Sequence, residues 1–176
     1  QAVPEEPELE SSYGLGPAAS KVYRKDHGLS IGGYGEFRYR AHVTDENDGL
    51  GGTKSVDDVS DALRAVLYTG YKFSDKVVMN SEIEFEHAGG SDVWVEFLTL
   101  DYFLREDVAL RGGLLLIPMG FVNEIHEPTF YFGAERPEVE LRIIPSTWRE
   151  NGAGIFGQVA DRLSYRFYAV NGFKAS

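Results

Sequence analysis

Cysteine is absent from this 176-residue chain. The absence excludes disulfides, thiolate metal ligands and cysteine nucleophiles. Basic residues are scarce as well, since 17 Lys and Arg stand against 28 Asp and Glu, for a formal net charge of -11. A nucleic-acid binder needs a basic footprint for phosphates, so no nucleic-acid partner is expected.

Long apolar runs are also missing, and none approaches the ~18 residues of a membrane-spanning helix. The opening stretch QAVPEEPELE has neither the basic start nor the apolar core of a signal peptide, and it fits a mature end left by signal cleavage. Aromatic residues, by contrast, make up 13% of the chain, and glycines number 20. This composition favours β-structure with many turns.

A two-residue hydrophobic period begins at Gly28, after a lead over residues 1–27 that has no clear periodicity. Leu29, Ile31 and Phe37 alternate with polar residues such as Glu36 and Arg38, which predicts a strand with one apolar and one polar face. Comparable segments follow at residues 62–73, 77–87, 93–104, 108–118, 151–159 and 163–173. Strands of about 9–12 residues are long enough to cross a bilayer when tilted.

The connections between these segments differ in length. Those near Asp75, Glu106 and Asp161 are short, the one near Gly90 is short and glycine-rich, and long loops cover residues 45–61 and 118–150. Short periplasmic turns and longer external loops are typical of outer-membrane barrels. The pattern predicts an all-β fold, a transmembrane antiparallel β-barrel with about seven strands at residues 28–176, preceded by a periplasmic extension at residues 1–27.

Asp101 tests this alternation. Counting strictly from Val93 would turn Asp101 toward lipid, at a cost of kcal/mol order if it lay deep in the membrane. A β-bulge near residues 96–98 is therefore predicted, which returns Asp101 to the inner face opposite Arg111. Pairing about the short turns also predicts partners for other residues: Arg64 with Glu86, Tyr68 with Glu82, Gly157 with Tyr165, and Ile155 with Phe167.

Charged side chains on the inner face are the candidate pore lining. They are Glu36, Arg38, Arg40, Arg64, Lys72, Glu82, Glu84, Glu86, Glu96, Asp101, Arg111 and Arg166. Long loops inside compact folds are usually functional, so the loop at residues 118–150 is the candidate constriction. Its charged residues are Glu124, His126, Glu127, Arg136, Glu138, Glu140, Arg142 and Arg149. The interleaved signs argue against strong anion selectivity.

Other chemistries compete for some of these residues. The Glu82, Glu84 and Glu86 row could bind a sugar or a cation on a soluble β-sandwich or barrel, but charged faces are usually solvated. Glu124, His126 and Glu127 are ligand types for zinc, yet HExxH spacing is absent. With no G-x-S-x-G elbow and no phosphate loop, we expect no enzyme, catalytic residue, metal or cofactor.

Several stretches resemble the N-terminal part of Gram-negative outer-membrane porins of the phosphate-selective porin O/P-like family. They are GLGPAASKVY, GLSIGGYGEF, LDYFLREDVALRGGLLLIPMGFVNEIHEP, RPEVE, IIPSTWRENGAGIFG and LSYRFYAVNGF. The resemblance implies a barrel in outer-membrane lipid, commonly a homotrimer, that lets small hydrophilic solutes or ions diffuse through a water-filled lumen.

The strand count adds one expectation to this resemblance. A barrel entered from the periplasm returns there with an even number of strands, whereas seven strands end on the outer side, and an open edge cannot lie in lipid. We therefore expect the chain to be part of a longer porin. A structural outer-membrane component with a plugged lumen is the third alternative.

Overall fold

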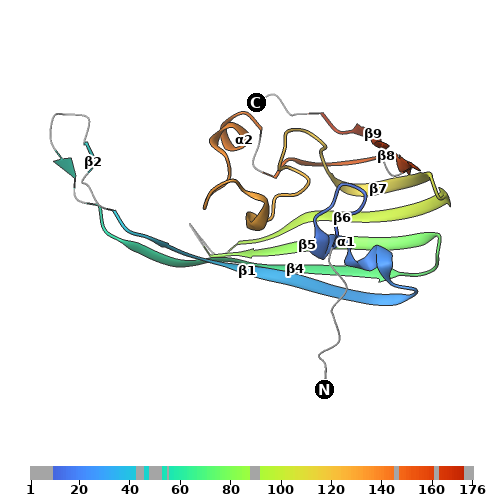
Figure 1. Ribbon diagram of the computed structural model, residues 1–176, viewed down its shortest axis with the longest axis horizontal. Helices are drawn as coiled ribbons and strands as arrows, with labels where there is room; N and C mark the ends of the chain where they lie inside the picture. Colours follow the sequence, from blue (N-terminus) through green and yellow to red (C-terminus); the bar gives the residue numbers. More distant parts are fainter. Residues whose placement is uncertain are drawn as a thin grey trace, which may run out of the picture.

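The computed structural model describes residues 10–42, 46–47, 53–54, 56–87, 92–144, 147–160 and 163–172 (Figure 1). Its helices and strands are, in chain order, α1 (Pro17–Ser20), η1 (Lys21–Arg24), β1 (Gly28–Arg40), β2 (Glu46–Asn47), β3 (Thr53–Lys54), β4 (Val59–Lys72), β5 (Val77–Glu86), β6 (Asp92–Arg105), β7 (Val108–Leu116), η2 (Pro128–Phe130), α2 (Glu138–Arg142), β8 (Arg149–Val159) and β9 (Leu163–Val170).

Seven strands form one antiparallel sheet in the order β1-β4-β5-β6-β7-β8-β9. This confirms the prediction of an all-β antiparallel fold with about seven strands. β1 and β9 are the two edges, so the sheet does not close into a barrel within the described residues. No helix in the described part of the chain is both long and apolar enough to cross a membrane.

The expected loop at residues 45–61 is shorter in the structure. β4 begins at Val59, and β2 pairs with β3 within the same segment. Other residues of this loop, 45, 48–52 and 55, lie outside the described residues, as do 88–91 and 161–162 in two of the expected turns.

Residues 10–27 are ordered, although the lead before β1 has no clear periodicity and predicts no regular elements. α1 and η1 form there and contact β1, β4 and β5 on the concave side of the sheet (Figure 1). Small and apolar residues make this docking possible. Leu15 and Ala19 join Tyr68, Phe97 and other wall residues in a buried apolar cluster, which predicts that burial, and not helix propensity, stabilises these short helices.

The predicted bulge in β6 is confirmed. Glu82 pairs with Phe97 and Ile83 pairs with Val95, so Glu96 is the extra residue. Beyond it the register returns Asp101 to the inner face, where it pairs with Arg111.

The other predicted cross-strand partners are confirmed as well, namely Arg64 with Glu86, Tyr68 with Glu82, Gly157 with Tyr165 and Ile155 with Phe167. Strict alternation along residues 62–73 predicts that Leu63 lies on the apolar outer face, and this prediction is wrong. Leu63 is the extra residue at a second register shift, between β1 and β4, and is buried.

The two faces of the sheet differ in the side chains that they expose and bury. On the outer face, Ile31 and Leu100 are each 54% exposed and Phe37 is 72% exposed. On the inner face, Asp101 is 0% and Arg111 is 4% exposed. Soluble domains rarely leave so contiguous an apolar surface uncovered while burying charged side chains.

Candidate functional site

Ion pairs connect neighbouring strands across the inner face. Arg64 on β4 donates from Nε to Glu36 on β1 at 2.8 Å and from Nη1 to Glu84 on β5 at 2.9 Å. Arg149, at the start of β8, donates to Glu96 in the bulge at 2.9 Å. The Arg64 guanidinium thus links β1, β4 and β5. The Arg149 guanidinium links the end of the long loop to β6.

Asp101 and Arg111 form the most buried arginine–carboxylate pair among the described residues. Arg111 donates from Nε and Nη2 to the two carboxylate oxygens, both at 2.8 Å, and its guanidinium lies 4.3 Å from the centre of the Phe156 ring. Tyr23 completes the cluster, donating to Asp101 Oδ2 at 2.7 Å while accepting from Arg111 Nη2 at 2.9 Å. A bidentate pair with a further hydrogen bond is the geometry that compensates charges removed from water.

The long loop is closed at its base by Asn123, which sequence reasoning missed. Its side-chain amide donates to the carbonyls of Ile117 at 2.7 Å and Trp148 at 2.9 Å, while its oxygen accepts from Trp148 N at 2.7 Å. The two ends also bond directly, Ile117 N to Trp148 O at 3.0 Å. A lone Asn in a long loop carries no periodic signal. We call residues 118–148 the constriction loop, because β8 begins at Arg149.

Two loop side chains are buried against the wall. His126 Nδ1 donates to Asn123 O at 3.1 Å, and its Nε2 lies 3.3 Å from Glu82 Oε1, an ion-pair distance without hydrogen-bond alignment. Tyr68 OH lies 3.2 Å from the same Glu82 oxygen and 3.4 Å from Glu127 Oε1. One hydroxyl hydrogen therefore serves two carboxylates, and His126, when protonated, places a positive charge beside Glu82.

Burial and these neighbours shift the pKa values of the loop residues. Burial by itself lowers the pKa of His126, but the Glu82 carboxylate outweighs it, and the net pKa is raised. Burial raises the pKa of Glu127, and the charge of Glu82 adds to the effect. Burial also raises the pKa of Glu124, although Arg166 donates to it at 2.8 Å and opposes the shift.

Other predicted loop residues occupy different places. Glu138 and Arg142 pair at 3.2 Å on the exposed side of α2, whereas Glu140 is buried and accepts from Phe121 N at 2.6 Å. Arg136 contacts the Tyr131 and Thr147 hydroxyls. The structure therefore does not assemble all eight loop candidates into one filter.

The wall candidates Arg38, Arg40, Lys72 and Glu86 make fewer contacts with the sheet. Arg38 and Arg40 both reach Glu135 of the loop, a partner that sequence reasoning missed. Lys72 donates to the Tyr23 carbonyl at 3.4 Å. Glu86 lines a polar pocket of about 280 Å³ together with Trp94, Glu96 and Arg149 among others.

The proposed zinc ligand types are not brought together. Glu124 pairs with Arg166, while His126 lies beside Glu82. Within the described ranges, no group of three or more His, Asp or Glu side chains could hold a metal ion.

Raising the pH above neutrality is expected to loosen the constriction loop. A His whose folded pKa is raised contributes stability that is complete below about pH 6.5 and is lost as pH rises through the folded pKa. The raised pKa of Glu127 acts in the same direction, since the folded state favours its protonated form. The groups facing His126 are Glu82, Glu96, Tyr68, Glu127 and Arg136.

The measurement is the melting temperature between pH 6 and pH 9 for His126→Gln, with exposed His27→Gln as the control. The decline should flatten in His126→Gln only. An unchanged decline in that variant would remove His126 as its origin.

The chain is 49% identical over 176 residues to a protein of Aquifex aeolicus (strain VF5) whose description is "Uncharacterized protein". The match covers 96% of this chain and 38% of the relative, so the chain spans well under half of that protein's length. A scan against protein-family models gives no match. A search of solved structures gives none either.

Proposed function

We propose that the chain forms part of the wall of an outer-membrane porin, through which small hydrophilic solutes or ions diffuse passively. The observation that carries the proposal is the contrast between the exposed apolar outer face and the buried ion pairs of the inner face. Lipid is the solvent that accepts an exposed apolar face on a sheet whose opposite face buries ion pairs such as Asp101 with Arg111.

The strands and their connections support the same proposal. The seven strands of the sheet contain 8 to 14 residues each, and about 9–11 suffice to cross a bilayer. The connections from β4 to β5, from β6 to β7 and from β8 to β9 are short, while those at the opposite end include the constriction loop.

The edges of the sheet bear on the size of the barrel. Unpaired backbone groups cannot lie in lipid, so a porin wall requires further strands between β1 and β9. The greater length of the Aquifex aeolicus relative is compatible with a larger barrel.

Charges on the wall and loop would set the selectivity of such a pore. Because the arginines of the inner wall are paired with carboxylates, as Arg64 is with Glu36 and Glu84, they do not form an unopposed basic ladder. The proposal is therefore a general porin, without strong preference for phosphate.

One observation favours a second candidate, an outer-membrane structural component with a plugged lumen. Residues 10–25 and the constriction loop both cover the inner face (Figure 1). The soluble sugar- or cation-binding alternative has less support, because Glu82 and Glu84 are already engaged by His126 and Arg64.

The test is the conductance of the complete natural protein in a planar lipid bilayer. Stepwise ion conductance is expected. Arg149→Gln should shift the reversal potential in a salt gradient toward cation preference, because it removes a positive charge from the end of the loop, beside Glu96.

Arg105→Gln is the matched control, since Arg105 forms an exposed pair with Asp107 in a short turn. A membrane-embedded protein without conductance would support the plugged component. A protein that is soluble and monomeric without detergent would contradict both membrane proposals.

A further inference from the structure

We infer that residues 10–25 form a plug on the inner wall that positions the constriction loop and thereby sets the opening it leaves. The effect on ion flow rests on the proposed porin function, whereas the positioning of the loop does not. We call residues 10–25 the N-terminal plug. Sequence reasoning had assigned them to an extension outside the barrel wall.

The plug is tied to the most buried ion pair of the wall. Tyr23 bonds both Asp101 and Arg111, and Arg111 Nη1 also donates to the Tyr13 carbonyl at 3.4 Å. Burial raises the pKa of Tyr23 far above its ordinary value, so its hydroxyl remains a donor. Two points of the plug, ten residues apart, therefore share one anchor on β6 and β7.

The wall is shaped to receive the plug. A Cβ added to Gly70 of β4 would lie 2.8 Å from the Val22 side chain, closer than real Cβ contacts allow. Asn80 of β5 is buried and donates to the Ala19 carbonyl at 2.8 Å. Gly70 leaves room for the Val22 side chain, and the Asn80 amide bonds the Ala19 carbonyl. These two contacts identify this part of β4 and β5 as the surface on which the plug packs.

The other side of the plug meets the constriction loop. A Cβ on Gly14 would lie 2.5 Å from Glu124 Oε1, and one on Gly16 would overlap the Glu127 carboxylate. Gly14 also has φ +84°, a conformation that favours glycine. The carboxylates of Glu124 and Glu127 thus lie against glycine backbone of the plug, where no side chain blocks them. The position of the plug therefore limits how deeply these two side chains enter the inner face.

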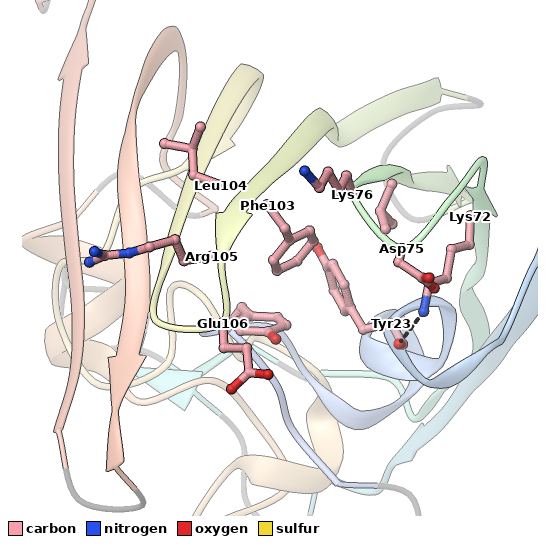
Figure 2. Close-up of a pocket in the computed structure, with 10 residues that line it drawn as sticks. Tyr23, Lys72, Asp75, Lys76, Phe103, Leu104, Arg105 and Glu106 are labelled. Atoms are coloured by element: carbon pink, nitrogen blue, oxygen red, sulfur yellow. Dashed lines mark hydrogen bonds between the residues drawn. The ribbon is translucent and has the colours of Figure 1, made fainter.

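The plug's contacts end at a cavity near the short turns. Tyr13, Tyr23 and Phe103 line about 400 Å³ there, together with charged residues of the β4–β5 and β6–β7 turns (Figure 2). Figure 2 shows the Phe103 and Tyr23 rings facing this space, with Lys72 bonded to the Tyr23 carbonyl. A cavity also borders the plug on the loop side, where Pro17, Ala18 and Glu127, among others, line about 420 Å³.

The test is limited proteolysis of the constriction loop in the complete protein in lipid vesicles, beside single-channel conductance. Gly16→Ala should displace Glu127 and speed loop cleavage about tenfold, since overpacking at this contact favours the open loop. Its matched control is Gly133→Ala in the same loop, because nothing lies within 4 Å of a Cβ added there. Tyr23→Phe is a second, milder variant that removes the anchor's hydroxyl and keeps the ring.

The outcomes separate the inference from the proposed function. Unchanged cleavage in both Gly16→Ala and Tyr23→Phe would overturn the positioning role, whatever the conductance. Faster cleavage in a protein that never conducts would uphold the positioning role and reject the porin. If the protein conducts, a variant with faster loop cleavage should also have a changed single-channel conductance, which would support the plug's role in setting the opening. A wild-type conductance in such a variant would overturn that role.

Discussion

Replacing Asp101 by Asn is expected to lower the free energy of unfolding by about 3–5 kcal/mol, the usual consequence of removing one partner of a buried ion pair. Arg111 would keep its charge at 4% exposure without the carboxylate that now accepts two of its hydrogen bonds. Tyr23 would lose its charged acceptor as well. Denaturant unfolding from lipid vesicles gives the measurement.

Asp107→Asn is the control, because Asp107 pairs with Arg105 at the surface and exposed pairs contribute only about 0–1 kcal/mol. The double variant Asp101→Leu with Arg111→Met should lose less than the sum of the two single changes, since no buried charge is left without a partner. Equal losses in Asp101→Asn and Asp107→Asn would show that the Asp101 pair contributes no more than a surface contact.

The sheet could be predicted from the sequence because its strands and turns are determined by residues that lie close together in the chain. Alternation gives the faces, and short turns fix the register of the strands they join. The cost of an outward carboxylate then placed a bulge near Glu96 and paired Asp101 with Arg111. The structure confirms both, because a single inserted residue is the smallest change that keeps Glu96 and Asp101 together on the inner face.

The covering of the inner face could not be predicted in this way. Ala18, Ala19 and Gly16 carry no periodic pattern, and their docking depends on notches such as Gly70 that lie far away in the sequence. The hydrogen bonds of Asn123 at the base of the constriction loop, and the pairing of Arg38 in β1 with Glu135, are also long-range contacts made by irregular segments. The residue types in the loop do not indicate which wall residue each side chain meets.

Leu100→Arg is expected to lower the free energy of unfolding from a bilayer by about 2–4 kcal/mol, the cost of Arg on the lipid face near the midplane. Leu100 lies toward the middle of β6, is 54% exposed and points away from Asp101. In water, an exposed Leu replaced by Arg changes stability by only about 0.5 kcal/mol in either direction. The size of the loss therefore depends on what solvent the outer face meets.

Val93 provides the matched comparison, since it is also exposed and apolar but lies one residue from the start of β6. The most direct test of a lipid-facing wall is the denaturant unfolding free energy of Leu100→Arg and Val93→Arg in lipid vesicles. A porin wall predicts a loss of about 2–4 kcal/mol at Leu100 and about 0–1 kcal/mol at Val93, nearer the interface. Equal and small changes at both positions would contradict it.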